Sequence, residues 1–299
     1  MRSVRFNPAY LLAGPAVAAI GVFFFVPALA ALFLSFTDFD IYSIADIGRL
    51  RFVGLRNYFG LLAEPRFWTA LWNTLYFVFI GGPLSVGVSL GAALLIDARA
   101  VRFKAFFRTV FFLPVVTTLV AVAVVWRYLY HPRHGLLNVA LSWVGIDPID
   151  WLGDPQWAMP AIILMAVWKN FGFNMIIFLA GLQSIPERLY EAARLDGAGA
   201  GQQFLHVTLP MLRPTFLFVA VMTMIGYCQL FAEPYVMTQG GPANSTLSLV
   251  LLMYEEGFRW WNIGYAAALA FTLLVLILSF TLLQLRLRPA EAAASREAR

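Results

Sequence analysis

The chain has 299 residues, of which 61% are hydrophobic and only 12% are charged, and its formal net charge is +5. A soluble domain carries about 25% charged residues to cover its surface, so this composition excludes an ordinary soluble enzyme and indicates a membrane protein with several spanning segments. The basic residues are scattered beside apolar segments rather than gathered on one face, which argues against nucleic-acid binding.

Six apolar runs are each long enough to span a lipid bilayer, whose hydrocarbon core of about 30 Å needs roughly 20 helical residues. They cover residues 10–36, 71–96, 106–130, 159–183, 215–236 and 264–285. Pro83, Pro114 and Pro160 lie within or at the ends of these runs, and membrane helices tolerate such prolines because neighbouring groups bond the freed carbonyls. The sequence predicts an all-α polytopic membrane protein with six transmembrane helices in one domain, 1–299.

The first run is preceded by Arg2 and Arg5 and has an Ala-Leu-Ala sequence at 28–30 near its end, a pattern that a cleaved secretory signal would also have. The run is longer than the apolar part of a usual signal peptide. We therefore interpret it as an uncleaved first helix.

The distribution of basic residues predicts the orientation, because cytoplasmic stretches carry an excess of Lys and Arg. With the N-terminus inside, the cytoplasmic stretches carry Arg2, Arg5, Arg99, Arg102, Lys104, Arg108, Arg188, Arg194, Arg213, Arg286, Arg288, Arg296 and Arg299. The external stretches carry fewer, namely Arg49, Arg51, Arg56, Arg66, Arg127, Arg133 and Arg259. Both termini are expected in the cytoplasm.

A short amphipathic helix is expected in the loop between the fourth and fifth runs, at about 184–214. Pro186 suits a first helical position, and Gly197 can end the helix in a left-handed conformation. Ala192 and Ala193 leave a small-residue surface that another protein could approach closely. The alternative is an interfacial helix that only anchors the loop to lipid headgroups, but the acidic residues of the segment suit a protein groove better than anionic lipid.

The same loop reads Glu-Ala-Ala, two residues, Asp-Gly-Ala, and then Phe204 and Leu209-Pro210. This pattern resembles the EAA loop of type I ATP-binding-cassette (ABC) importer permeases. The resemblance implies a coupling helix that docks into a groove on a separate ATPase subunit. The residues that match, and to which the resemblance gives this coupling role, are Glu191, Ala192, Ala193, Asp196, Gly197 and Ala198.

Further segments look like the sugar and glycerol-phosphate branch of that family, similar to the maltose-type first permease subunit. They are residues 54–58 with Trp68 and Asn73-Thr74, Leu113-Pro114, 168–170, 181–186 and 235–242. The chain lacks the additional helices and the large periplasmic insertion of the enterobacterial maltose permease, so contacts of that insertion are not carried over. The resemblance implies a bacterial inner-membrane permease that pairs with a second homologous permease in a heterodimer, with two ATP-binding-cassette ATPase subunits and with an extracytoplasmic solute-binding protein.

The chain contains no phosphate-binding loop, which needs Gly-Lys followed by Ser or Thr. Its only lysines, Lys104 and Lys169, follow Phe103 and Trp168. ATP and Mg are therefore expected on the partner ATPase, and this chain is expected to bind no cofactor or metal and to catalyse no reaction. The single cysteine, Cys228, excludes a disulfide framework.

Polar side chains inside the fourth and fifth runs are the candidates for the substrate pathway, because such groups are costly at membrane depth. Aromatic faces stack on the apolar faces of a sugar ring, while amides and carboxylates hydrogen-bond its hydroxyls. The candidates are Asn170, Phe173, Asn174, Tyr227, Gln229, Glu233 and Tyr235, with Lys169 beside them. Two alternatives remain open: Lys169 and Glu233 can lie near an interface or pair structurally, and the aromatic residues can pack against lipid or the protein core.

Two other functions compete with this interpretation. An intramembrane hydrolase needs a nucleophile beside a base or a metal set, yet His131, His134 and His206 form no metal-like motif on a membrane face. An ion-coupled secondary transporter would work without an ATPase, and the docking loop argues against it, although it remains the alternative. The solute could be an oligosaccharide, a monosaccharide, a polyol or a glycerol phosphodiester.

Overall fold

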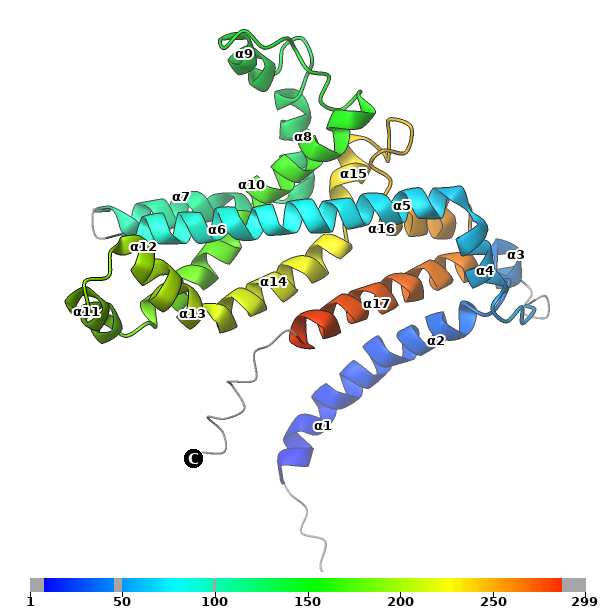
Figure 1. The fold of residues 1–299 in the computed structure, drawn as a ribbon. Helices are drawn as coiled ribbons and strands as arrows, with labels where there is room; N and C mark the ends of the chain where they lie inside the picture. The colour runs from blue at the N-terminus through cyan, green and yellow to red at the C-terminus, as the bar shows by residue number, and fades with distance from the viewer. Residues whose placement is uncertain (1–7, 46–49, 99–100, 287–299) are drawn as a thin grey trace, which may run out of the picture. The chain divides into compact units, whose positions relative to one another are not determined.

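The computed structural model describes residues 8–45, 50–98 and 101–286, and its regular structure is helical, with one antiparallel bridge between Thr37 and Phe52 in these ranges (Figure 1). In chain order the helices are α1 (Pro8–Ile20), α2 (Val26–Leu34), α3 (Ile41–Ala45), α4 (Arg56–Ala63), α5 (Pro65–Tyr76), α6 (Gly82–Asp97), α7 (Lys104–Val116), α8 (Leu119–Leu129), α9 (Leu136–Ser142), α10 (Pro155–Gln183), α11 (Glu187–Leu195), α12 (Ala200–Gln203), α13 (Leu209–Met211), α14 (Arg213–Cys228), α15 (Ala232–Met237), α16 (Leu249–Tyr254) and α17 (Ile263–Arg286). Single π-helical turns join α1 to α2, α5 to α6 and α12 to α13, and a fourth follows α16.

Four stretches of the described chain are continuous helices long and apolar enough to cross a membrane. They are Leu12–Leu34, Pro65–Asp97, Pro155–Gln183 and Ile263–Arg286. Two further spans are bent: α7 and α8 meet at 97°, and the segment Ala200–Met211 meets α14 at 66°. With each bent pair counted as one span, the described residues give six, so the predicted all-α polytopic fold is confirmed.

Two of the predicted helices differ from the observed ones. The third run was expected to form a continuous helix over 106–130, but the backbone becomes extended at Thr117 and Thr118, with ψ of 149° and 137°, and the helix restarts in a new direction. The fifth run was expected to continue to 236, but α14 ends at Cys228. Phe231 has φ −142° and ψ −61°, which no helical residue adopts, so the chain after α14 forms the separate short helix α15.

The described residues belong to two compact units, one of 1–65 with 252–274 and the other of 66–251 with 275–299. In the first unit, the Asn57 amide donates to the carbonyls of Ser35 and Thr37, at 2.9 and 2.8 Å, and so fixes the chain that follows α2. Gly264, the second residue of α17, lies close to Thr37, and its backbone N–H donates to the Phe39 carbonyl at 2.9 Å. These bonds satisfy backbone groups that would otherwise be unpaired at the helix ends.

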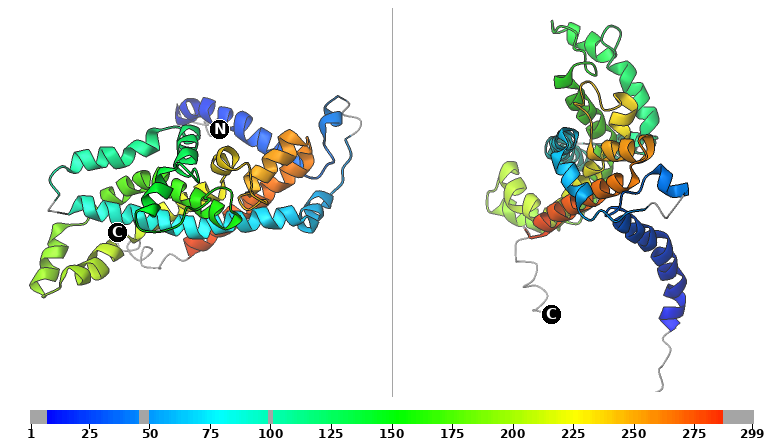
Figure 2. Two further views of the ribbon diagram at one scale, coloured as in Figure 1. Left: turned by 90° about the horizontal axis from the view of Figure 1, so that it is seen from above. Right: turned by 90° about the vertical axis from the view of Figure 1, so that its right-hand side faces the viewer.

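The second unit is organised around α10, which packs along α6 and also contacts α7 and α14. Asp154 caps its N-terminus by accepting a hydrogen bond from the Gln156 backbone N–H at 2.8 Å, and Pro155 occupies the first turn, where no N–H is needed. Gly172 lets the backbone of α7 approach α10 directly. In Figures 1 and 2, α11 and α12 project at the end of this unit where α6 ends and α7 begins.

The loop between α15 and α16 is held against α5 by side chains of α5. The Asn73 amide donates to the carbonyls of Asn244 and Leu247, at 2.8 and 2.9 Å, and the Thr74 hydroxyl accepts from the Leu249 backbone N–H at 3.0 Å. Gly240, with φ +84°, lies in the Gly-Gly-Pro sequence of this loop. Buried backbone groups of this loop are thereby paired, which fixes the position of the turn.

Candidate functional site

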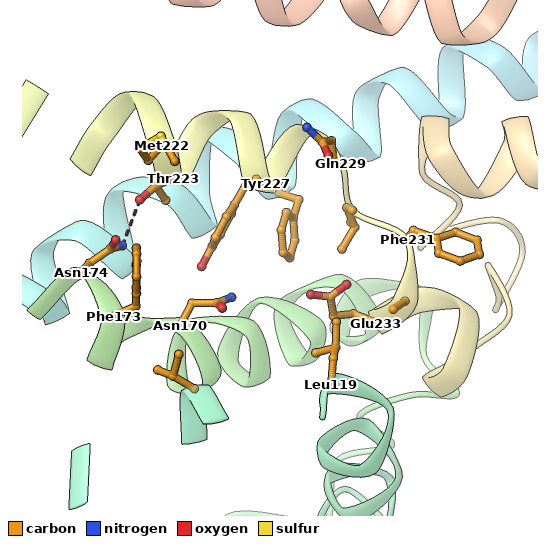
Figure 3. Close-up of a pocket in the computed structure, with 15 residues that line it drawn as sticks. Leu119, Asn170, Phe173, Asn174, Met222, Thr223, Tyr227, Gln229, Phe231 and Glu233 are labelled. Atoms are coloured by element: carbon orange, nitrogen blue, oxygen red, sulfur yellow. Dashed lines mark hydrogen bonds between the residues drawn. The ribbon is translucent and has the colours of Figure 1, made fainter. Parts of the chain in front are cut away.

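A cavity of about 580 Å³ lies in the second unit, between α10, α14 and α15 and beside the junction of α7 and α8 (Figure 3). Six of the seven predicted pathway residues line it, and Tyr235 is the exception. The full lining consists of Phe77, Val115, Leu119, Asn170, Phe173, Asn174, Met222, Thr223, Gly226, Tyr227, Gln229, Leu230, Phe231, Ala232 and Glu233. The mixture of amide, phenol and carboxylate groups with aromatic rings is suited to a polar organic solute.

The wall that α10 contributes follows helical spacing. Asn170, Phe173 and Asn174 stand at intervals of three and four residues and therefore share one face. The Asn174 amide donates to the Thr223 hydroxyl of α14 at 2.9 Å, which ties the two helices together beneath the cavity. Asn170 stands nearer to the middle of the cavity, facing Tyr227 (Figure 3).

Tyr227 contributes both a ring and a hydroxyl to the opposite wall. Its ring packs against Phe77 with centroids 4.7 Å apart, and Gly81 leaves the room that this ring needs. Only 5% of the residue is exposed. Its hydroxyl lies close to Ser85 and Asn170 but forms no hydrogen bond of good geometry with any residue in the described part of the chain. A buried donor in this situation has an unused hydrogen-bonding capacity.

The remaining predicted residues lie beyond the end of α14, not within a fifth helix as expected. Gln229 is the residue that caps α14, and Glu233 stands in the first turn of α15. Tyr235 stacks on Phe231 with ring centroids 5.2 Å apart and lies outside the cavity lining. The chain therefore turns at 229–231, and this turn brings Glu233 back to face α10 (Figure 3).

Lys169 stabilises the break between α7 and α8. Its ammonium donates to the Val115 carbonyl at 3.0 Å, and the residue is only 7% exposed. Carbonyls at a helix C-terminus lack intrahelical partners and carry partial negative charge, so a cation is favourable there. Glu233 is near enough to interact with this ammonium electrostatically. Of the two open interpretations of Lys169, the structure favours a structural role over an interfacial one.

Replacing this ammonium is expected to destabilise the chain measurably. Lys169→Met keeps the side-chain length but leaves the Val115 carbonyl unpaired and Glu233 without its neighbouring cation, which should lower the free energy of unfolding by about 2–3 kcal/mol. Lys104→Met is the matched control, because Lys104 also donates to a carbonyl at a helix end, that of Asp97 at 2.7 Å, but is less buried than Lys169. Thermal unfolding in detergent would measure both, and equal shifts would contradict the role given to Lys169.

The loop after α10 forms the helix α11, whose C-terminus is closed by a left-handed glycine, as predicted. Gly197 has φ +80°, and its backbone N–H donates to the Arg194 carbonyl at 3.1 Å. The backbone N–H of Ala198 donates to the Ala193 carbonyl at 2.8 Å. This pair of bonds is a Schellman motif, which glycine forms without steric cost. The expected start is one residue off, because Pro186 precedes the helix in an extended conformation and Glu187 is its first residue.

One face of α11 is packed and the opposite face is exposed. Leu189 and Tyr190 pack against an apolar cluster that includes Ile185, Leu182 and Leu212, and the Tyr190 hydroxyl bonds Thr208 at 2.9 Å. The exposed side carries four of the six predicted coupling residues, and Ala193 and Ala198 are partly buried; the exposed ones are Glu191, Ala192, Asp196 and Gly197. Leu195 beside them is 89% exposed.

The chain, with its bent spans and its projecting helix α11, can be compared with known proteins. The family model for the binding-protein-dependent transport system inner membrane component matches residues 16–292. The chain belongs to this family. It is therefore the membrane component of such a system, a multi-pass protein of the inner membrane in which ATP hydrolysis belongs to another subunit, and the ion-coupled secondary transporter is set aside.

Curated relatives of this permease cover almost all of its length. It is 38% identical to the lactose transport system permease protein LacF of Rhizobium radiobacter, over 92% of each chain. It is 36% identical to the probable ABC transporter permease protein YurN of Bacillus subtilis, over 93% of this chain and 94% of that one. A permease chain in the crystal structure of a bacterial alginate ABC transporter, in complex with an alginate pentasaccharide-bound periplasmic protein, superposes with a TM-score of 0.77 over 92% of both chains, at 23% identity, and so shares its fold.

Sequence reasoning missed most of the apolar lining of the permease cavity. The missed residues are Phe77, Val115, Leu119, Met222, Thr223, Gly226, Leu230, Phe231 and Ala232. Thr223 is a polar residue inside the fifth run, and the criterion used for the other candidates would have included it, whereas nothing in the sequence distinguishes the apolar residues from others that face lipid. Pro114 marks a point in the third run where a helix can be weakened, but α7 continues past it to Val116, so it did not give the position of the break beside Val115 and Leu119.

Proposed function

We propose that this permease forms one half of the translocation pathway of an ABC importer for carbohydrate-type solutes. The observation that carries the proposal is that one chain combines a cavity lined by amide, phenol and carboxylate groups with a projecting helix, α11, which presents Glu191, Ala192 and Asp196 to solvent. The cavity provides a place for a solute, and the helix provides a surface for the subunit that supplies energy.

The carbohydrate class is supported by the names of the relatives and by the chemistry of the cavity. LacF is named for lactose, and a 35% identical relative from Bacillus subtilis is named for arabinooligosaccharides. In this chain, the carboxamides of Asn170 and Asn174 can bond sugar hydroxyls, and the rings of Phe173 and Tyr227 can pack on the apolar faces of a sugar.

The partners follow from the coupling residues. Glu191, Ala192, Ala193, Asp196, Gly197 and Ala198 would contact one of two ATP-binding-cassette ATPase subunits, which hold ATP and Mg. A second homologous permease would complete the pathway, and an extracytoplasmic solute-binding protein would deliver the solute. We place the coupling loop at about 184–214 and both termini in the cytoplasm, and we propose that residues 1–299 act as one membrane domain.

The coupling is mechanical. Leu189 and Tyr190 of α11 pack on the same apolar cluster as Phe178 and Leu182 of α10, and α10 carries Asn170 further along. Because close-packed side chains transmit displacement, a movement of α11 driven by the ATPase would shift α10 and change access to the cavity. Alternating access of the cavity to the two sides of the membrane follows from such movement.

Co-purification with the products of neighbouring genes tests this proposal. An affinity-tagged permease is expected to retain an ATPase and a second permease, and the complex should hydrolyse ATP faster when its solute-loaded binding protein is added. Uptake into proteoliposomes should require ATP and persist when ion gradients are collapsed. The proposal fails if no ATPase associates, or if an ion gradient drives uptake in its absence.

A further inference from the structure

We infer that the cavity accepts uncharged polyhydroxy solutes and rejects anionic ones such as uronides and phosphate esters. This inference rests on the proposed function and narrows it, because the sequence left neutral sugars, polyols and glycerol phosphodiesters equally open. Three features of the cavity carry it: the sign of its charge, an unused hydroxyl, and its aromatic walls.

The charged group on the cavity wall is a carboxylate. Among the described residues that line the cavity, Glu233 is the one acidic residue and there is no lysine or arginine. The nearest cation, Lys169, is directed into the helix break, where it bonds the Val115 carbonyl at 3.0 Å, and it does not line the cavity. Lys169 interacts with Glu233 electrostatically but does not line the cavity, so an anionic solute would contact the Glu233 carboxylate directly and would contact no basic side chain of the kind that anion sites use.

The second feature is the Tyr227 hydroxyl. Tyr227 as a residue is 95% buried. Its hydroxyl lacks a well-formed hydrogen bond to any described residue and is directed toward Asn170 in the cavity (Figure 3). Leaving such a group unpaired is unfavourable, so a small movement of Asn170 that admits a ligand hydroxyl would form a hydrogen bond there at little further desolvation cost. The Asn170 amide beside it can donate and accept, which matches the dual character of a sugar hydroxyl.

The third feature is the aromatic wall. Phe77 and Tyr227 form a tilted pair at 4.7 Å on one side, and Phe173 stands on the other side, half exposed. The C–H faces of a sugar ring pack on such surfaces, whereas the solvation shell of a phosphate or carboxylate does not. Neutral rings with hydroxyls at their edges therefore satisfy all three features together.

The test compares matched pairs of small ligands that differ at one exocyclic group, which is neutral in one member and anionic in the other. Methyl β-glucopyranoside and methyl β-galactopyranoside are each paired with the methyl glycoside of the corresponding uronic acid, in which a free carboxylate replaces the terminal CH₂OH. Binding to the purified permease complex in nanodiscs is measured by saturation-transfer NMR without the binding protein, so that the permease alone decides. We expect saturable binding of at least one glycoside and binding of its uronide weaker by about tenfold or more.

Two substitutions and their controls locate the effect. Glu233→Gln removes the charge at constant size. It should reduce the ratio of glycoside affinity to uronide affinity to about threefold or less. Tyr227→Phe should weaken glycoside binding by about two- to tenfold, with its uronide no better bound. Asp147→Asn and Tyr128→Phe alter the same groups at exposed positions outside the cavity and should change neither value.

The inference is overturned if a uronide binds as well as its glycoside, if none of the four ligands binds saturably, or if Glu233→Gln leaves the ratio unchanged. The same preparations are assayed for bound ATPase. If the ATPase is retained but the ligands are not discriminated, only this inference is wrong. If no ATPase is bound, the proposed function is wrong.

Discussion

The Gly197→Val substitution is expected to uncouple ATP hydrolysis from transport. Gly197 has φ +80°, a conformation that a β-branched residue adopts only at a steric cost of about 1–2 kcal/mol or more, while nothing lies within 4 Å of its added Cβ. The strain falls on the Schellman motif that ends α11, and its relief would move Asp196 and Ala198 from the surface proposed to contact the ATPase. Transport and ATPase rates of the reconstituted complex would measure the effect, and we expect transport to fall by about tenfold or more.

The control for this prediction lies two residues away. Gly199 is also exposed, but its φ of −71° and ψ of 171° suit any residue, and its added Cβ would meet no atom closer than 4.0 Å. Gly199→Val should therefore retain coupling. Glu191→Ala provides an independent check, because this exposed carboxylate can be removed without disturbing α11. If Gly197→Val and Glu191→Ala both transport at the wild-type rate, α11 is not the coupling helix.

The Gly172→Ala substitution is expected to have the largest effect on stability. A Cβ at this position in α10 would collide with the carbonyl oxygen of Phe111 in α7 and lie 2.9 Å from its carbonyl carbon. Both atoms belong to the backbone, so no side chain can rotate away, and α7 must separate from α10. We expect the free energy of unfolding to fall by about 3 kcal/mol or more.

A second glycine separates this steric effect from the effect of alanine on helices in general. Gly91 lies inside α6, and a Cβ there would meet nothing within 4 Å. Gly91→Ala should be neutral or raise stability by up to about 1 kcal/mol, because alanine is the better helix former. Thermal unfolding of the two variants in the same detergent would compare them, and a stable Gly172→Ala protein would mean that α7 and α10 do not pack this closely.

The spanning segments could be predicted because they are set by composition, whereas their breaks could not. Pro114 was tolerated as expected and lies inside α7, and the helix ends only at Thr117 and Thr118. Threonines are common in membrane helices, so they give no warning. The end of α14 was missed for another reason: Pro234 lies within the fifth run, and its ring would oppose the Leu230 carbonyl of a continuous helix, but a proline fixes neither the residue at which the helix ends nor the turn at Phe231.

The candidate site also contains residues that the sequence could reveal and residues that it could not. Asn170, Asn174 and Glu233 were identifiable because a polar group in an apolar run needs a partner or a cavity. Tyr235 was grouped with them on the assumption of one continuous fifth helix, and the turn before α15 places it outside the cavity lining. Val115 and Leu119 join the site only through the bend between α7 and α8, so no property of the residues themselves could have revealed them.

That bend also affects how the permease can move. An intact helix resists bending because each added degree lengthens hydrogen bonds of its ladder, but the ladder is already interrupted where Thr117 and Thr118 are extended. Rotation of α8 about this joint leaves the bonds of both helices in place, and the Lys169 ammonium holds the joint from the α10 side. The third span therefore consists of two helices joined at a point without helical hydrogen bonds, so α7 and α8 can change their mutual angle without breaking the hydrogen bonds of either helix.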